Sequence, residues 1–282
     1  MGFLHQGHQS LVTRSLEEND VTVVSIFVNP SQFAPGEDLN SYPRNLDHDL
    51  SLLSNTSVTK RRVTLVFAPT VSEMYPSGIP LETSQQRGGF INVLGVTEQL
   101  EGRCRPAFFR GVTTIVGKLL NIVEPDNAYF GQKDVQQTVV VRRMVKDLFF
   151  NTKITVVPIV RNETGLALSS RNAYLSDPVK NKATILFKSL KLAHDAYENS
   201  QLEVVKLTGL ITGSIKSAST EFQIDYVSFN DPDDLHYLDA IDPAKGCIVS
   251  MAVFVPNVFG KTEQTRLIDN WILQPMKNGK FN

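Results

Sequence analysis

The stretch Val21-Thr22-Val23-Val24-Ser25-Ile26-Phe27-Val28 is a short, nearly continuous run of apolar and β-branched residues. Such a run is typical of a parallel strand that helices cover on both faces. Three more strand-like runs follow it in the first half of the chain, at 64–68, 128–130 and 154–160. Segments with apolar residues at helical spacing separate these runs, so the sequence predicts βαβ units and a parallel sheet.

The sequence pattern changes after about Ser170. The helices predicted before it span 9–18, 46–53, 111–123 and 133–148. After it, two helical stretches at 178–199 and 203–217 precede two runs, 222–229 and 248–255, that suit half-exposed antiparallel strands. We therefore expect an α/β domain over residues 1–160 and a smaller α+β domain over 161–282. The polar tail 274–282 predicts a frayed end.

Composition narrows the class of protein. The 282 residues are 41% hydrophobic and 20% charged, as in an ordinary globular enzyme. A formal net charge of -1 gives no overall field that would attract nucleic acid or an anionic membrane, and no apolar run reaches the length of a membrane span. Two distant cysteines, Cys104 and Cys247, form neither a disulfide framework nor a metal motif. We expect a cytoplasmic protein without nucleic-acid or membrane partners.

The chain begins inside a Gly/His-rich loop, Gly2 to His8, that leads into a predicted helix. In a doubly wound fold a phosphate-binding loop lies between the first strand and the first helix. No strand precedes this loop, so we expect the parallel sheet to lack its first strand in this chain. A lost central strand would remove several buried aliphatic side chains, each worth about 1.5–3 kcal/mol.

The tetrapeptide His5-Gln6-Gly7-His8 is the sharpest local signal for chemistry. At the start of a helix, two histidines three residues apart point the same way. The helix N-terminus offers N–H groups and a positive dipole end to a phosphate, and imidazoles add further donors. The alternative is a solvated terminus with two incidental histidines. A metal site is less favoured because no third ligand stands nearby.

Two other segments offer groups that suit phosphate. Gly131-Gln132-Lys133-Asp134 follows the strand-like run at 128–130, where the carboxyl edge of a parallel sheet binds ligands. Gly165 to Asn172 combines Ser169, Ser170 and Arg171, which can make charge-assisted hydrogen bonds. The alternatives are a helix cap with a solvated lysine for the first segment and a simple turn or cap for the second.

The segment Asn29-Pro30-Ser31-Gln32-Phe33 lies at the carboxyl end of the first predicted strand. Asn29 and Gln32 carry neutral donors and acceptors, which suit a polar acid substrate. Turn chemistry alone is the alternative explanation for these residue types.

Taken in order, these segments resemble the motifs of the pantothenate synthetase family. The matching segments are Met1–His8, Ser25–Phe33, Tyr129–Gln137 and Gly165–Leu175, with shorter matches at Gly36–Arg44, Met74–Pro76 and Arg266–Asn270. The resemblance spans nearly the whole chain, and the ordered set is far more specific than the two-histidine loop alone. Gln132 replaces a common acid and Leu168 a common Met, both beside expected ATP contacts. The stretch 54–62 is longer and more polar than the short linker of the family, which predicts a surface excursion.

The resemblance implies a Rossmann-like nucleotidyltransferase domain with a smaller C-terminal domain that closes over the active site, usually in a homodimer. It implies a ligase that uses ATP and Mg²⁺ to form pantoyl-adenylate and then joins pantoate to β-alanine, giving pantothenate, AMP and pyrophosphate. It implies catalytic roles for His5, His8, Lys133, Ser169, Ser170 and Arg171, and no residue is assigned to Mg²⁺. The implied ATP contacts are Met1, Gly2, Phe3, Leu4, His5, Gln6, Gly7, His8, Gly131, Gln132, Lys133, Asp134, Val160, Leu168, Ser169, Ser170 and Arg171, and the implied pantoate and β-alanine contacts are Gln32, Asn29, Gln137 and Arg105.

Two other functions compete with this ligase. A cytidylyl- or adenylyltransferase acting on a phosphate substrate would explain His5 and His8, but not the neutral pair Asn29 and Gln32. A truncated, non-catalytic relative would explain the absent strand before Met1.

Overall fold

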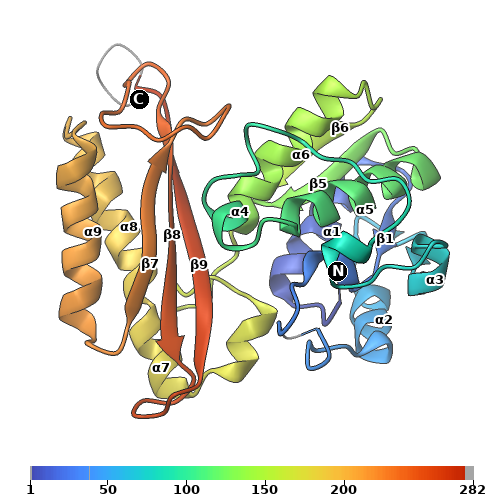
Figure 1. Cartoon of the computed structure of the whole chain (residues 1–282), viewed down its shortest axis with the longest axis horizontal. Coiled ribbons are helices and arrows are strands. Elements are labelled where there is room, and N and C mark those ends of the chain that lie inside the picture. The colour runs from blue at the N-terminus through green and yellow to red at the C-terminus, as the bar shows by residue number, and fades with distance from the viewer. Residues whose placement is uncertain (1, 38, 277–282) are drawn as a thin grey trace. The chain divides into compact units, whose positions relative to one another are not determined.

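The chain forms two compact units in a computed structural model that describes residues 2–37 and 39–276 (Figure 1). The first unit comprises Met1–Gln132 and Gln136–Pro158, and the second comprises Lys133–Val135 and Ile159–Asn282. No helix among the described residues is both long enough and apolar enough to cross a lipid bilayer.

Two parallel strand pairs form the sheet structure of the first unit. β1 (Val23–Ser25) pairs with β4 (Leu65–Phe67), and β5 (Asn127–Gly131) pairs with β6 (Lys153–Val157). The predicted parallel arrangement is therefore confirmed. β1 is shorter than the predicted eight-residue strand, although backbone hydrogen bonds extend the contact by one residue at each end, to Thr22 and Ile26. No strand pairing among the described residues joins the two pairs.

The helices of the first unit largely follow the predicted apolar spacing. α5 (Phe108–Val123) buries one apolar face, and its C-cap Glu124, with a φ of 47°, stops the helix. α1 (Gln6–Glu18) begins three residues earlier than predicted because His5 caps it. The other helical elements are η1 (Pro30–Gln32), α2 (Leu46–Ser54), α3 (Val71–Met74), η2 (Thr83–Gln85), α4 (Glu101–Cys104), η3 (Gln132–Asp134) and α6 (Val135–Asp147).

The predicted surface excursion at 54–62 is a small antiparallel hairpin. β2 (Ser57–Val58) and β3 (Arg61–Arg62) are joined by Thr59 and Lys60, which have φ values of 47° and 70°. Positive φ at both central residues is the geometry of a tight hairpin turn. The hairpin also supports α1, because the Arg61 guanidinium donates to the carbonyls of Leu16 and Glu17 at the C-terminal end of that helix.

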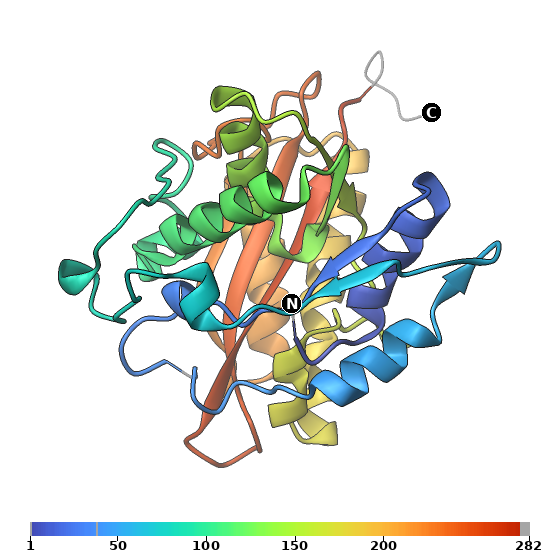
Figure 2. The same cartoon turned by 90° about the vertical axis from the view of Figure 1, so that its right-hand side faces the viewer.

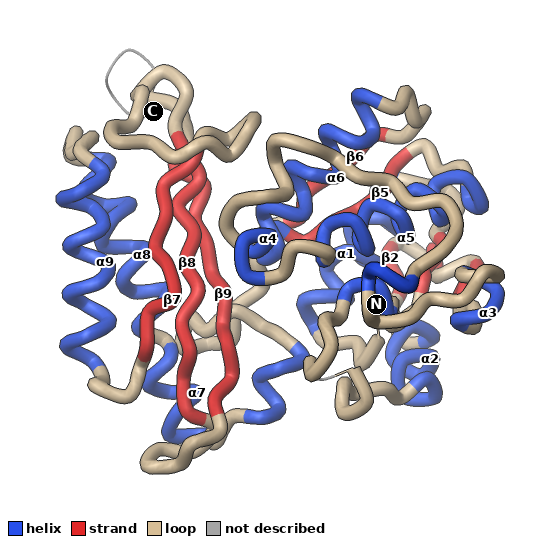
Figure 3. Tube along the Cα trace, in the orientation of Figure 1, coloured by secondary structure: helices blue, strands red, loops and turns tan. Residues whose placement is uncertain are grey.

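The second unit is an antiparallel sheet covered by helices. Its strand order is β7-β8-β9, and α8 and α9 lie side by side against one face of the sheet (Figures 2 and 3). The strands are β7 (Gln223–Asn230), β8 (Cys247–Pro256) and β9 (Gln264–Leu273); the helical elements are η4 (Ser170–Tyr174), α7 (Asp177–Ala183), α8 (Ile185–Glu198) and α9 (Val204–Ala218).

Two sequence predictions for this unit need correction. The single helix predicted at 178–199 is two helices that meet at Thr184, which caps one helix and starts the next. The tail is not frayed up to Met276, which is 8% exposed, packs into the core and donates its N–H to the carbonyl of Pro243. The rest of the predicted tail, 277–282, lies outside the described residues.

Candidate functional site

The two histidines of the N-terminal loop form the first turn of α1 together. His5 is the N-cap, and its Nδ1 accepts a hydrogen bond from the N–H of Gly7 at 3.0 Å. The reciprocal hydrogen bond is also present, because His8 Nδ1 accepts from the N–H of His5 at 3.3 Å. The two rings lie 4.1 Å apart between centroids. The structure thus brings both predicted imidazoles to one helix N-terminus, with His8 inside the helix rather than before it.

This reciprocal cap fixes the protonation pattern of both rings. A neutral imidazole has one N–H donor and one acceptor nitrogen. Since each Nδ1 accepts from the backbone, each ring carries its hydrogen on Nε2. Two half-buried imidazole donors therefore accompany the N–H groups at the positive end of the helix dipole. Such an arrangement suits an anionic phosphate.

A buried carboxylate holds the loop that precedes the helix. Asp49 in α2 is 1% exposed, and its two oxygens accept from the N–H groups of Phe3 at 2.9 Å and Leu4 at 2.6 Å. Phe3 has a φ of 52°, so this backbone turn is one that a residue with a side chain seldom adopts. Asp49 was not among the residues selected from the sequence. An acid in the predicted helix at 46–53 shows no local sign of binding a loop 45 residues earlier.

Asn29 and Gln32 come together at the end of β1, as the sequence suggests. Asn29 is 4% exposed, and its Nδ2 donates to Gln32 Oε1 at 3.0 Å and to the carbonyl of Gly111 at 3.1 Å. Its Oδ1 accepts from the Tyr75 hydroxyl at 2.7 Å and from the N–H of Ser31 at 3.3 Å. All the hydrogen-bonding capacity of the Asn29 amide is therefore used by the protein.

Arg105 also binds the segment that contains Gln32. Its guanidinium binds both oxygens of Glu37, at 2.7 and 2.6 Å, and donates to the carbonyl of Gln32 at 2.6 Å. It also lies over the ring of Phe108 at 4.2 Å. Arg105 is thus held by four contacts, and in this structure its direct role is to fix the backbone of Gln32.

The adjacent glutamines of α6 have different environments. Gln136 is 3% exposed, and its amide bonds the backbone of Glu101, Val96 and Gln99, so its role is structural. Gln137 is half-buried, and its amide makes no hydrogen bond to another described residue. Of the two, Gln137 is therefore the one with an amide that can bind a substrate.

In the second unit, β9 anchors two of the predicted segments. Asn270 donates its Nδ2 to the carbonyl of Lys133 at 3.0 Å. Its neighbour Asp269 forms a bidentate pair with Arg161 at 2.6 and 2.7 Å, and Arg161 in turn donates to the carbonyl of Gly165 at 3.1 Å. Asp269 and Asn270 lie in a matched motif, but no role was predicted for either of them.

The loop from Gly165 to Arg171 is shaped by its backbone. Gly165 has a φ of 101°, and a Cβ there would lie 2.6 Å from the Phe187 ring. The N–H of Leu168 donates to the carbonyl of Val160 at 3.0 Å, so these two predicted ATP contacts lie next to each other. Ser169 caps η4 by accepting from the N–H of Arg171 at 3.3 Å, and Ser170 is 7% exposed.

The remaining predicted residues lie in or beside these segments. Lys133 is 22% exposed in its side chain and lies 3.7 Å from the carboxylate of Asp134, which is 52% exposed. Gly131 ends β5, and Gln132 begins η3. Gly2 and Leu4 are buried, whereas Gln6 is exposed. Met1 lies outside the described residues.

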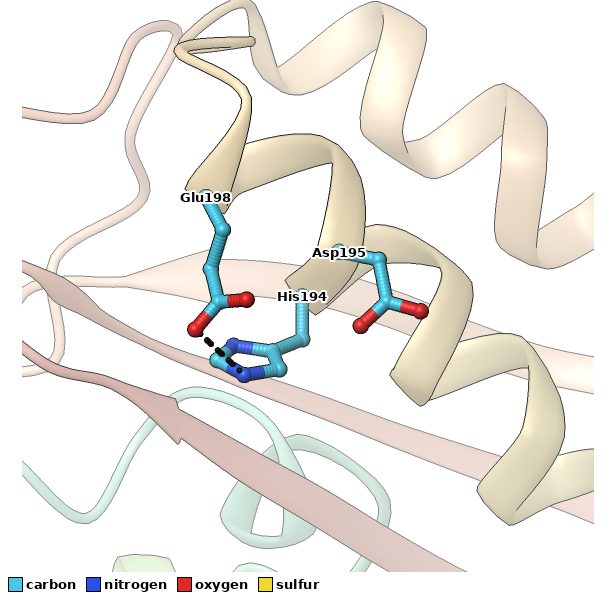
Figure 4. A group of neighbouring side chains, drawn as sticks. All are labelled: His194, Asp195 and Glu198. Atoms are coloured by element: carbon cyan, nitrogen blue, oxygen red, sulfur yellow. Dashed lines mark ion pairs between the residues drawn. The ribbon is translucent and has the colours of Figure 1, made fainter. Parts of the chain in front are cut away.

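A group of possible metal ligands lies elsewhere, on α8 (Figure 4). It consists of His194, Asp195 and Glu198. His194 Nε2 lies 3.1 Å from Glu198, and the ring stacks on Trp271 with 4.7 Å between centroids. Both oxygens of Asp195 accept from Lys191, at 2.8 and 2.7 Å. These contacts are ordinary stabilising pairs along a helix, so we assign the group no part in the site.

Parallel strand pairs and a helix N-terminus with two imidazole donors define an α/β protein with a helix end that is suited to an anion. Comparison with known proteins identifies the family. The family model described as "Pantoate-beta-alanine ligase" matches residues 1–272. The chain belongs to the pantoate–β-alanine ligase family.

Individual relatives agree with this family. A protein of Saccharomyces cerevisiae named "Pantoate--beta-alanine ligase" is 46% identical, with 97% of this chain and 90% of that protein covered. The crystal structure of pantothenate synthetase from Thermus thermophilus has a TM-score of 0.85 at 39% identity, with 98% and 91% covered. A Francisella tularensis pantoate-beta-alanine ligase, solved with "Beta-gamma ATP and Beta-alanine", has a TM-score of 0.72 at 32% identity, with 97% and 87% covered.

These matches decide between the competing functions. Each of these three relatives carries a ligase or synthetase name, so the phosphate-substrate transferase is wrong. The match extends over nearly the whole of this chain and about nine-tenths of the yeast protein, and it gives no support to a non-catalytic relative.

Proposed function

We propose that this chain joins pantoate to β-alanine with ATP as the energy source, by way of pantoyl-adenylate. The proposal rests on family membership and on the pair His5 and His8 at the start of α1, which supplies donors of the kind that a phosphate needs. The chemistry explains why ATP is required. A carboxylate is a poor electrophile, and adenylation turns its oxygen into part of a good leaving group.

The reaction has two steps. A carboxylate oxygen of pantoate attacks the α-phosphorus of ATP, and the bond to the β-phosphate oxygen breaks to release pyrophosphate. The amine of β-alanine then attacks the acyl carbon, loses a proton and displaces AMP, which leaves pantothenate. Charge on the α-phosphate rises in the first step. Donors already in place, such as Nε2–H of His5 and His8, stabilise that charge without rearrangement.

The other assigned residues divide by chemistry. We assign Gly2–His8, Gly131–Asp134, Val160 and Leu168–Arg171 to ATP, with Lys133, Ser169, Ser170 and Arg171 pairing with phosphate oxygens. Gln32 and Gln137 are assigned to pantoate and β-alanine, and Asn29 and Arg105 support Gln32.

Mg²⁺ is proposed as the companion of ATP. When bound it neutralises part of the charge on the phosphates, and it is usually held by those phosphates with one or two carboxylates. Among the segments assigned to ATP, Asp134 fits this requirement because its carboxylate is 52% exposed and only loosely paired with Lys133.

A homodimer in the cytoplasm is proposed from the resemblance in sequence. Neither Cys104 nor Cys247 forms a disulfide with another described residue, as is common in a reducing compartment. Sedimentation at micromolar concentration would give twice the 31.4 kDa chain mass for a dimer, and a single chain mass would refute it.

The first test is ATP–pyrophosphate exchange that depends on pantoate. Because His5 and His8 also cap α1, the informative variants are His5→Asn and His8→Gln, which keep cap acceptors but remove the imidazoles. We expect each variant to lose about 100-fold or more in exchange rate, the effect of one lost charge-stabilising donor, while its melting temperature stays close to that of the parent. No pantoate-dependent exchange in the parent chain would overturn the ligase, and unchanged exchange in both variants would overturn the role of the imidazoles.

A further inference from the structure

The amide of Gln32 has a fixed direction in this structure. Its Oε1 accepts from Asn29 Nδ2 at 3.0 Å, so the oxygen faces the protein. Its Nε2 makes no hydrogen bond to another described residue, and the side chain is half-buried. Gln32 therefore presents two N–H donors to whatever binds beside it. Those donors suit the carboxylate and hydroxyl oxygens of a hydroxy acid such as pantoate.

The direction of the Gln32 amide depends on Asn29. If the Asn29 amide turned over, its oxygen would face Gln32 Oε1 and the carbonyl of Gly111, which are both acceptors. Its NH₂ group would meanwhile face the N–H of Ser31, which is a donor. The observed orientation is thus the one that satisfies each neighbour.

The shortest contact to Asn29 comes from Tyr75. The Tyr75 hydroxyl donates to Asn29 Oδ1 at 2.7 Å, compared with 3.3 Å for the backbone contact from Ser31 to the same oxygen. Tyr75 is 5% exposed, and burial raises the pKa of its hydroxyl, which therefore stays a neutral donor. Asn29 is also buried, so losing this donor would leave a polar atom without its main partner.

The Tyr75 ring is itself held in place. The Lys118 ammonium lies 4.2 Å from the ring centroid and donates to the carbonyl of Met74. Burial lowers the pKa of Lys118. A phenylalanine at position 75 would keep the ring and its contact with Lys118, so it would remove the hydroxyl with little change in packing.

We propose that Tyr75 is a positioning residue for pantoate, acting through Asn29 to hold the Gln32 amide with its donors toward the substrate. This inference rests on the proposed ligase activity. It adds a third member to the pair Asn29 and Gln32, in a motif, Met74-Tyr75-Pro76, whose role the sequence left open.

The test is a double-mutant cycle on Tyr75→Phe and Gln32→Ala, with pantoate varied at saturating ATP and β-alanine. A neutral hydrogen bond contributes about 0.5–1.5 kcal/mol, so Tyr75→Phe should lower kcat/KM for pantoate by about 2- to 12-fold. The change should lie mainly in the KM for pantoate, with the KM for ATP unchanged. In the Gln32→Ala background, Tyr75→Phe should have less than about a twofold further effect, because the residue through which it acts is gone.

Tyr197→Phe is the matched control. It also removes a buried hydroxyl that bonds an oxygen, the carbonyl of Gln274 at 2.9 Å, but it lies in the second unit. We expect its KM for pantoate to equal that of the parent chain. Equal effects of Tyr75→Phe with and without Gln32 would overturn the relay, as would an unchanged KM for pantoate in folded Tyr75→Phe protein. An inactive parent chain would instead overturn the ligase assignment and the relay with it.

Discussion

At the scale of single residues, the site depends on side chains that hold other groups in place. Asp49 accepts two backbone N–H groups of the N-terminal loop, and Arg105 holds the Gln32 backbone while it is itself paired with Glu37. Both side chains bind backbone groups of the loops that carry the proposed binding residues. A loop holds its binding groups in a defined position only when further contacts fix its backbone.

Asp49→Asn tests the support of the histidine loop. The asparagine can accept one of the two N–H groups, but its NH₂ would face the other donor. Hydrogen bonds to a charged group contribute about 1.5–3 kcal/mol each, so we expect a comparable loss in the free energy of unfolding and a rise of at least about tenfold in the KM for ATP. Urea denaturation and steady-state kinetics would measure both.

Asp47→Asn is the control for this variant, since it makes the same change on an exposed position of the same helix. Asp47→Asn should leave the free energy of unfolding and the KM for ATP within error of the parent values. If the two variants behaved alike, Asp49 would not be holding the loop.

The residues proposed to carry chemistry have local signals in the sequence, whereas the residues that position them have none. His5, His8, Asn29 and Gln32 were selected because their functional groups lie at the end of a strand or the start of a helix. Asp49 and Tyr75 act on residues that lie 45 and 46 positions away in the chain. No local pattern marks a contact of that length, because it depends on how the elements pack.

At the scale of elements, β9 connects the core of the second unit to the segments assigned to ATP. Its residue Asp269 holds Arg161 and through it the carbonyl of Gly165, while Asn270 holds Lys133. Arg161 also lies 4.4 Å from the ring centroid of Phe187. A guanidinium that is both paired in two places and stacked is poorly replaced by lysine.

Arg161→Lys should therefore weaken the loop that carries Ser169, Ser170 and Arg171. We expect the free energy of unfolding to fall by about 1.5–3 kcal/mol and the KM for ATP to rise several-fold. Arg266→Lys is the control, because Arg266 forms a similar pair with Asp225 between β9 and β7 and lies elsewhere on the strand. It should reduce stability less and leave the KM for ATP unchanged. A rise in KM in both variants would mean that general loosening of β9 is the cause.

β9 is the long strand that the sequence did not predict. Its polar residues Arg266, Asp269 and Asn270 interrupt the apolar pattern that marks β7 and β8. They are buried or half-buried because each has a specific partner. Periodicity predicts strands whose faces differ in polarity, and it fails where paired polar groups occupy a core strand.

At the scale of the whole molecule, Cys247 links stability to pH. The thiol is 1% exposed in the core of the second unit, and burial raises its pKa to about 12. A thiol in the unfolded chain ionises near about pH 8.5. The folded state therefore binds the thiol proton more tightly than the unfolded state does. The contribution of this thiol to the free energy of unfolding is intact below about pH 8.5 and is lost as the pH rises toward about 12.

We expect the free energy of unfolding to fall between about pH 8.5 and about pH 10. Ionisation of Cys247 in the unfolded chain should contribute up to about 1.4 kcal/mol per pH unit to that slope. Urea denaturation at several pH values would measure that slope. Cys247→Ala should be less stable at neutral pH because it leaves a cavity, yet its slope should be smaller by this amount. An identical slope in both proteins would assign the pH dependence to other groups.

The order of the two kinds of structure along the chain could be predicted from the sequence, since βαβ spacing and antiparallel alternation differ in period. The sequence could not predict that Lys133–Val135 belong to the second unit. These residues lie just after β5, yet they group with the second unit, where Asn270 binds the Lys133 carbonyl. Only a contact across more than a hundred residues places them there.

Gly165 limits how this chain can drift in sequence. A side chain at that position would be disfavoured twice, by the left-handed backbone and by the Phe187 ring at 2.6 Å. A smaller residue at position 187 would make room for that side chain but would remove the ring on which Arg161 stacks. Positions 165, 187 and 161 would therefore have to change together. A library randomised at position 165 and selected for growth without added pantothenate would therefore return glycine almost alone, whereas Gly209 in α9, with nothing within 4 Å of a built Cβ and no left-handed backbone, would return a broader set.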